Sequence, residues 1–263
     1  MITADRSSRA SVALRNLPPF PLVAAKVADL LASELSSFDA VAETLNTDAA
    51  LAAEVLRLAN SPLISVRYNV TSVAQALGLL GSRRVVTLIM TLSLSKMMKR
   101  ASKSEAMRRL WRHNLACALA ARHLAEISRT DSNQAYYAGL FHDIGRLGLM
   151  AQNVAAYDKA IQNGEDIDEM EQRLFGVSHT EAGAWVVEKW KLPKAFVEVA
   201  LQHHHPTKDA SDLTLLVCLA CQTADRLGFS LMPVHGDKEL GPTDEVGFAI
   251  ALAINALETE YGI

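Results

Sequence analysis

The stretch GLFHDIGRLG, residues 139–148, carries the most specific chemistry of this chain. It places an imidazole and a carboxylate on adjacent positions, His142 and Asp143. Adjacent positions of a regular helix point about 100° apart, so both side chains can bind one ion only near a helix end or a kink. We expect Ile144 and Gly145 to supply that kink. The dipeptide is therefore a candidate metal-binding element.

The sequence on both sides of this stretch predicts helices. The chain has only 13 glycines and 8 prolines in 263 residues, is rich in alanine and leucine, and shows no strand alternation. Capping-box patterns begin helices after Ser72 and Ser178, and Gly81 ends one. We expect an all-α fold of two packed helical lobes.

The polar stretch KRASKSE, residues 99–105, is the best candidate for the junction between the lobes. Residues 1–16 are polar and without periodicity, which predicts a flexible leader. Residues 17–100 then form the N-terminal helical lobe, and residues 105–263 form a second lobe that holds all eight histidines.

Composition excludes several classes of protein. A net charge of −3 argues against a nucleic-acid partner and against an anionic membrane surface. The apolar stretches Val85–Leu94 and Val246–Leu257 are shorter than the ~20 residues that a membrane span requires, and the N-terminus lacks the apolar core of a signal peptide. We expect a cytoplasmic protein without a membrane partner.

Three cysteines leave an odd count, at Cys117, Cys218 and Cys221. The last two lie within LLVCLACQTADRL, which predicts one apolar helix and not the strand-to-helix junction of a redox motif. We expect all three to be small buried residues with reduced thiols.

Two further residues extend the His142-Asp143 pattern. His113 lies upstream in LWRHNLACALAARHLAE, and Asp225 lies downstream in CQTADRLG. In this order the residues resemble the H…HD…D metal signature of the HD superfamily of metal-dependent phosphohydrolases, over residues 105–228.

The N-terminal half of the chain adds a resemblance to a more specific family. LPPFPLVAAKVADLL (residues 17–31), DAALAAEVLRLANSP (48–62) and VTSVAQALGLLGSRRVVTLIM (70–90) are similar to the HDOD domain, an HD-related output module of bacterial signalling proteins. The segment LFGVSHTEAGAWVVEKWKLP (174–193) and the HHHP run (203–206) extend the likeness to residues 17–228. The resemblance implies an all-helical module that acts through a signalling or regulatory protein partner.

The resemblance also implies a set of metal ligands. The first ion would be held by His113, His142, Asp143 and Asp225, and a second by His179, His203 and His204, with Asp143 bridging the two. This mixed nitrogen and oxygen set suits one or two divalent ions of Fe, Mn, Ni or Zn. The alternative is a relic of hydrogen-bonded side chains, and for His179 a surface position after the Ser178 cap. His123, His205 and His235 are expected to be ordinary histidines.

Two departures bear on activity. Arg146 follows HDIG where active HD-GYP phosphodiesterases carry lysine, so it suits a phosphate contact and not proton donation. No Gly-Tyr-Pro occurs, which argues against cyclic-di-GMP hydrolysis.

We therefore expect a regulatory module with a retained metal site, to which a phosphorylated small molecule is a further candidate ligand. The alternative is a metal-dependent phosphohydrolase of a nucleotide or other phosphoester, with Asp143 and Arg146 as catalytic residues. A third interpretation is a scaffold with an empty site.

Overall fold

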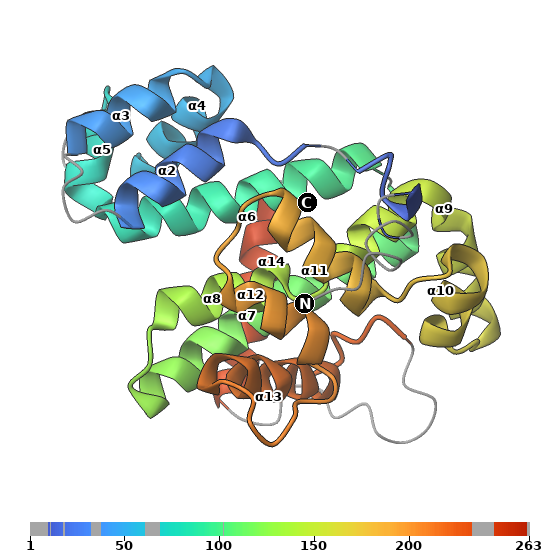
Figure 1. Cartoon of the computed structure of the whole chain (residues 1–263). Coiled ribbons are helices and arrows are strands. Elements are labelled where there is room, and N and C mark those ends of the chain that lie inside the picture. The colour runs from blue at the N-terminus through green and yellow to red at the C-terminus, as the bar shows by residue number, and fades with distance from the viewer. Residues whose placement is uncertain are drawn as a thin grey trace. The chain divides into compact units, whose positions relative to one another are not determined.

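The structure is a computed structural model of the chain. It describes residue 10 and residues 12–17, 19–32, 38–60, 69–101, 103–232 and 245–261. Within these ranges every regular element is a helix (Figure 1), which confirms the all-α prediction. The first nine residues of the predicted leader and His235 lie outside the described residues.

The chain divides into two compact units, Pro19–Lys96 and a larger one formed by Met1–Pro18 with Met97–Ile263. The smaller unit holds α2 (Leu22–Ala32), α3 (Phe38–Asn46), α4 (Ala49–Ala59), α5 (Val73–Leu80) and most of α6 (Ser82–Ala101). Within it α3 packs against α2, α4 and α5.

Local signals define the helix ends of the smaller unit. The side chain of Asp48 accepts hydrogen bonds from the first turn of α4, and Ser72 does the same for α5. Gly81 ends α5 with a φ of 79°, a backbone conformation that glycine adopts without strain. Asn60 ends α4. Its side-chain amide donates a hydrogen bond to the Val70 carbonyl and accepts one from the Val70 backbone N–H, each over 2.8 Å.

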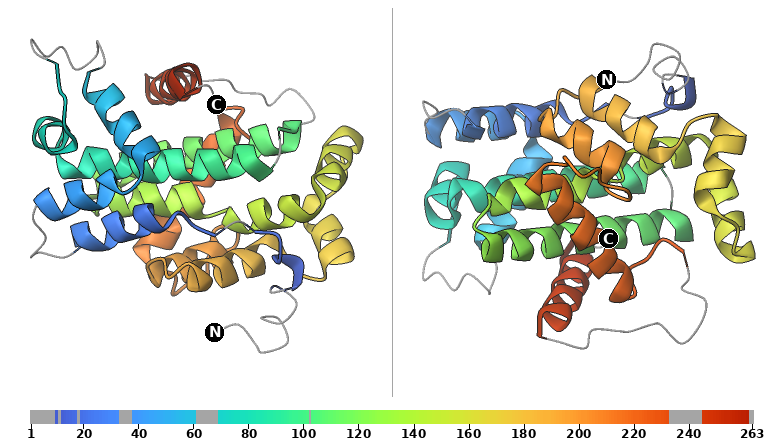
Figure 2. Two further views of the ribbon diagram at one scale, coloured as in Figure 1. Left: turned by 90° about the horizontal axis from the view of Figure 1, so that it is seen from above. Right: turned by 60° about the horizontal axis from the view of Figure 1, so that its bottom comes forward.

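The larger unit carries the candidate site. Its helices are α7 (Glu105–Ser128), α8 (Ser132–Phe141), α9 (Ile144–Asn163), α10 (Ile167–Phe175), α11 (His179–Lys189), α12 (Ala195–Gln202), α13 (Asp212–Arg226) and α14 (Glu245–Tyr261). The long helix α7 packs against α8, α9, α13 and α14, and α11 packs against α9 and α12. Figure 2 shows α7 and α8 side by side in both views.

Glycines allow two of these helix contacts to be close. A Cβ atom on Gly139 of α8 would lie 2.8 Å from the Cys117 carbonyl oxygen of α7. A Cβ atom on Gly145 of α9 would overlap the His179 carbonyl at the start of α11. Each pair of helices therefore meets backbone to backbone beside the candidate site.

The described part of the predicted leader packs against α9. Leu14 and Leu17 are buried, and the Leu14 side chain lies against Gly148. The Gln152 side-chain amide donates a hydrogen bond to the Val12 carbonyl over 3.1 Å. These described residues are packed, and the predicted flexible leader and domain boundaries stay predictions.

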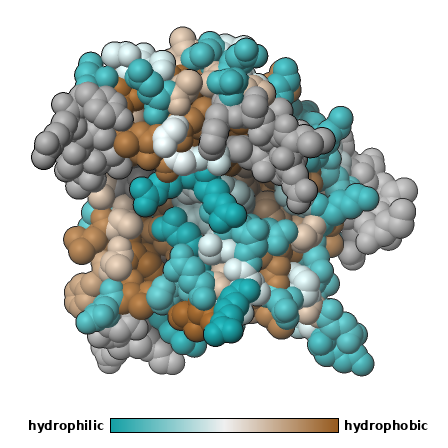
Figure 3. All heavy atoms as spheres, turned by 90° about the vertical axis from the view of Figure 1, so that its left-hand side faces the viewer, coloured by the Kyte–Doolittle hydropathy of each residue, from teal (hydrophilic) through white to brown (hydrophobic). Residues whose placement is uncertain are grey.

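Among the described helices, none is by itself both long and apolar enough to span a membrane. The pair α5 and α6 meets that requirement only jointly and is bent by 112° at its break. On the face drawn in Figure 3, hydrophilic and hydrophobic residues both reach the surface.

Candidate metal centre

The His142-Asp143 dipeptide forms the break between two helices. His142 ends α8 and Asp143 precedes α9, so neither lies inside a regular helix. The expectation of a helix end at this motif is confirmed, but the expectation that Ile144 and Gly145 form the kink is wrong. Both already belong to α9, where Gly145 serves the close contact with α11 instead. The break allows both buried side chains to face one interior space.

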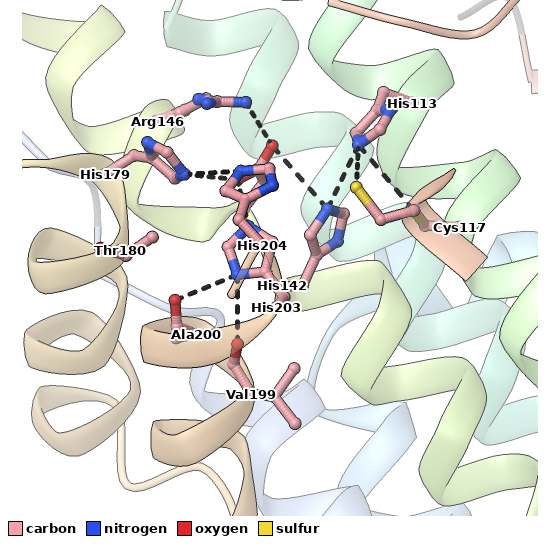
Figure 4. Close-up of polar contacts among 12 residues, drawn as sticks. His113, Cys117, His142, Arg146, His179, Thr180, Val199, Ala200, His203 and His204 are labelled. Atoms are coloured by element: carbon pink, nitrogen blue, oxygen red, sulfur yellow. Dashed lines mark hydrogen bonds and ion pairs between the residues drawn. The ribbon is translucent and has the colours of Figure 1, made fainter. Parts of the chain in front are cut away.

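Figure 4 shows the imidazole rings of His113, His142, His179, His203 and His204 gathered in this space. Their ring nitrogens fall into two neighbouring sets of donors. The first, the cysteine–histidine group, consists of His113, Cys117, His142 and Cys221. The second, the aspartate–histidine group, consists of Asp143, His179, His203 and His204.

In the cysteine–histidine group the two imidazoles face each other. His113 Nε2 lies 3.3 Å from His142 Nε2, 3.5 Å from Cys221 Sγ and 3.9 Å from Cys117 Sγ. Burial acts to lower the pKa of His113, but Cys221 and Asp225 raise it to about 9. A hydrogen bond with Cys117 and the charge on His113 lower the pKa of the Cys221 thiol, which favours a thiolate.

In the aspartate–histidine group the Asp143 carboxylate faces imidazole nitrogens. Asp143 Oδ1 lies 3.4 Å from His203 Nε2 and 3.6 Å from His179 Nε2, and His204 Nε2 lies 3.1 Å from His179 Nε2. Asp143 Oδ2 lies 3.8 Å from His142 Nε2, so the carboxylate stands between the two groups.

Two atoms of this group show that it fits a cation. Asp143 Oδ1 and His203 Nε2 are both buried, and neither has a hydrogen-bond partner among the residues that the structure describes. A buried polar atom left in this way costs about 1–3 kcal/mol. His203 Nδ1 shares its proton between the Val199 and Ala200 carbonyls, each at 3.1 Å, which leaves Nε2 free to ligate.

Burial and charge set the protonation of these histidines. Burial lowers the pKa of His203, and burial together with His203 lowers the pKa of His204 to about 3, so both stay neutral. Burial and Arg146 act to lower the pKa of His179, but Glu171 and Asp168 raise it to about 9. A divalent ion would replace a proton there.

His179 is buried at the first position of α11, so the surface interpretation is wrong for it. The predicted capping box of Ser178 and Glu181 is confirmed and holds this helix start in place. Glu171 of α10 then fixes the ring, since its Oε2 accepts hydrogen bonds of 2.8 Å from both the backbone N–H and Nδ1 of His179.

Arg146 is engaged by three carboxylates. Its guanidinium donates to Asp143 Oδ2 at 2.9 Å, to Asp168 Oδ1 at 3.1 Å and to Glu171 Oε1 at 3.3 Å. Burial acts to raise the pKa of Asp143, but the charges of Arg146 and His142 hold it well below its usual range. A phosphate could reach Arg146 only by displacing one of these partners, so the phosphate contact stays a prediction.

Asp225 is the one predicted ligand that the structure does not bring into either group. Its side chain is 45% exposed and lies beside His113 Nδ1, 3.5 Å away, on the side of the ring opposite to the ligand nitrogen. Cys221, one turn earlier on α13, takes the inward position instead.

The sequence interpretation did not place two cysteines and two acids beside the predicted ligands. Cys117 follows His113 by one helical turn, and this i, i+4 spacing was the available signal. Asp168 and Glu171 had no such signal, because the packing of α10 on α9 brings them to Arg146. His123 and His205 belong to neither donor group.

Comparison with known proteins places the fold in a family. Residues 17–206 match the model of the HDOD domain. The structure of an HDOD domain protein of unknown function from Geobacter sulfurreducens is similar, with a TM-score of 0.73 at 24% identity over 97% of this chain and 95% of that chain. No curated protein matches the chain.

Two further solved structures share the fold. A candidate phosphohydrolase from Shewanella amazonensis SB2B has a TM-score of 0.66 at 24% identity, over 95% of this chain and 94% of that chain. A candidate signal transduction protein from Marinobacter aquaeolei VT8 has a TM-score of 0.69 at 19% identity, over 98% of this chain and 65% of that chain.

Proposed function

Because the chain belongs to the HDOD domain family, we propose that it is a bacterial signal-transduction module that carries a divalent metal centre of the HD type and acts through a protein partner. A phosphorylated small molecule that binds the centre is the proposed input. The partner is proposed on the family resemblance, and the metal centre on the geometry of the site.

The observation that carries the metal centre is that Asp143 Oδ1 and His203 Nε2, 3.4 Å apart, are buried and have no hydrogen-bond partner among the described residues. Asp143, His179, His203 and His204 would hold an ion there. Their nitrogen and oxygen donors suit Mn, Fe, Ni or Zn. When bound, such an ion supplies positive charge for a phosphoryl group and acidifies bound water.

Arg146 favours binding over turnover. Hydrolysis of a phosphoester needs a proton for the leaving oxygen, and a guanidinium holds its protons too tightly to supply one. Burial acts to lower the pKa of Arg146, but Asp143 and Glu171 raise it further above its ordinary value. The Arg146 guanidinium can therefore hold an anionic group in place but cannot donate a proton to a leaving oxygen.

A metal-dependent phosphohydrolase is the second candidate function. The supporting observation is the placement of Asp143, which presents Oδ1 to His203 and Oδ2 to His142. A carboxylate so placed can serve two cations at once, as phosphoester hydrolysis by a pair of ions requires. The description of one structural relative as a candidate phosphohydrolase agrees with this alternative.

One experiment separates these functions. The purified protein is reconstituted with Mn²⁺, Fe²⁺ or Zn²⁺, its metal content is measured by plasma mass spectrometry, and it is assayed with p-nitrophenyl phosphate, bis-p-nitrophenyl phosphate and nucleotides. Asp143→Ala removes the shared carboxylate, and His123→Ala is the matched control outside both donor groups.

For the signalling module we expect bound metal that Asp143→Ala reduces and His123→Ala keeps, without turnover of any phosphoester. Turnover that Asp143→Ala abolishes would instead establish the phosphohydrolase. Failure of every metal to bind the reconstituted protein would overturn both functions and leave a scaffold.

A further inference from the structure

The cysteine–histidine group brings two thiols to the place where the HD pattern predicts a carboxylate. Its donors come from α7, from the break after α8, and from α13. His113, Cys117, His142 and Cys221 are all buried, and their ligand atoms lie within 4.8 Å of one another. Asp225 stays at the surface beside the far nitrogen of His113.

Two of the distances from His113 Nε2 match the edges of a tetrahedron around zinc. With Zn–N of about 2.0 Å and Zn–S of about 2.3 Å, two nitrogens lie about 3.3 Å apart, and a nitrogen and a sulfur about 3.5 Å apart. The Nε2 atoms of His113 and His142 are separated by 3.3 Å, and His113 Nε2 and Cys221 Sγ by 3.5 Å. Cys117 Sγ is slightly further from His113 Nε2, at 3.9 Å.

Both imidazoles are held in the tautomer that ligation needs. His113 Nδ1 donates to the Phe229 carbonyl at 2.9 Å, and His142 Nδ1 donates to the Gly139 carbonyl at 2.6 Å. Ligand histidines commonly donate their second ring nitrogen to a backbone carbonyl in this way. The two Nε2 atoms consequently face each other, and their lone pairs repel unless a proton or a cation lies between them.

The donor set selects a class of metal. Thiolates are soft ligands that favour zinc over the harder manganese and magnesium ions. Two thiolates also cancel the charge of a divalent ion, so the complex is neutral and suits a fully buried position. Binding releases to solvent whatever protons the two thiols and the imidazoles still carry.

From this geometry we infer that His113, Cys117, His142 and Cys221 form a closed Cys₂His₂ site for zinc or another thiophilic divalent ion, and that Asp225 is not a ligand. Four protein ligands complete a tetrahedron and leave no position for water or substrate. The inference deepens the proposed function and rests on it, because it assigns this half of the centre a structural role.

Cobalt(II) is the probe that tests the site. Tetrahedral cobalt with thiolate ligands gives an intense near-ultraviolet charge-transfer band and strong visible bands, neither of which depends on activity. The reduced, metal-free protein is titrated with Co²⁺ without oxygen, and zinc is then added in competition. The variants are Cys117→Ser, Cys221→Ser and Asp225→Asn, with Cys218→Ser as the matched control, since Cys218 is buried on α13 outside the group.

We expect the thiolate band in the wild type, its loss by at least half in Cys117→Ser and Cys221→Ser, and its full retention in Cys218→Ser and Asp225→Asn. Zinc should displace cobalt and abolish the bands. Cobalt binding without a thiolate band, or loss of the band in Asp225→Asn with the thiols intact, would overturn the site while leaving the proposed function standing. Absence of any cobalt, zinc or manganese binding would overturn both.

Discussion

The two donor groups meet at His142 and Asp143 but are built in different ways. In the cysteine–histidine group, backbone carbonyls orient both imidazoles, at Phe229 and Gly139. In the aspartate–histidine group, backbone carbonyls orient His203, but charged side chains hold Asp143 and His179, and Arg146 is the common partner of three carboxylates.

This difference shows that the residue types of the ligands do not by themselves determine how tightly a site binds metal. Arg146 already supplies, beside Asp143, some of the positive charge that a metal would bring. In the cysteine–histidine group, a hydrogen bond with Cys117 and the charge on His113 lower the pKa of the Cys221 thiol, whereas burial raises the pKa of the Cys117 thiol. We therefore expect the cysteine–histidine group to bind metal more tightly.

The largest loss of stability should come from Arg146→Met, which removes the guanidinium beside the aspartate–histidine group. It removes the guanidinium from the buried carboxylates of Asp143 and Glu171, which costs about 3–5 kcal/mol in the metal-free protein. Urea unfolding in the presence of a chelator measures this loss, and added Mn²⁺ or Zn²⁺ should restore part of it.

The matched control is Arg173→Met, whose ion pair with Glu165 is exposed at the arginine side. Its expected cost is below about 1 kcal/mol. A loss for Arg146→Met no larger than that of the control would show that the network does not depend on its guanidinium.

A smaller loss is expected from Gly145→Ala, which separates α9 from α11 beside the aspartate–histidine group. The added Cβ atom meets the His179 carbonyl and the Gly183 backbone nitrogen, neither of which can rotate away. We expect a loss of about 3 kcal/mol in unfolding free energy, together with weaker metal binding through His179. Gly78→Ala is the control, because nothing lies within 4 Å of the position of its Cβ atom, and an unchanged Gly145→Ala protein would contradict the close contact.

Tyr157→Phe probes the acids behind the aspartate–histidine group without changing charge. The buried hydroxyl donates to Glu171 Oε1 over 3.0 Å, and its removal deletes one hydrogen bond to a charged group. The expected loss is about 1.5 kcal/mol by urea unfolding. Combining it with Glu171→Gln in a double-mutant cycle should show coupling between the two residues, and additive effects would argue against the bond.

The smallest effect is expected at the cysteine–histidine group, on substitution of Asp225. Asp225→Asn keeps the size of a half-exposed side chain that lies beside the far nitrogen of His113. We expect zinc affinity to change by less than about twofold, since exposed charge pairs contribute little. Competition with a chromophoric chelator measures the affinity, and a tenfold loss would restore Asp225 to the ligand set.

Local signals in the sequence were enough to predict the helices and many of their ends. Ser72, Gly81 and the Ser178 capping box act within one turn of chain, so their patterns translate directly into helix boundaries. The same locality predicted a helix end at His142 and Asp143, although the break precedes the residues expected to cause it.

The composition of the site was less predictable, because residues four apart share a helix face. Cys221 and Asp225 compete in this way for the position facing His113, and only the packing of α13 on α7 decides that the thiol points inward. The positions of Asp168 and Glu171 beside Arg146 depend on how α10 packs against α9, which no spacing within one helix encodes.

The separation of the ligands along the chain has a consequence for the topology of folding. His113 and Cys221 lie 108 residues apart, yet their side chains are neighbours. An ion held by both acts as a reversible cross-link that closes a long loop, comparable with a disulfide that removes about 4–5 kcal/mol of conformational entropy from the unfolded chain. Loss of the ion would return that freedom to the chain between α7 and α13 while leaving every covalent bond intact.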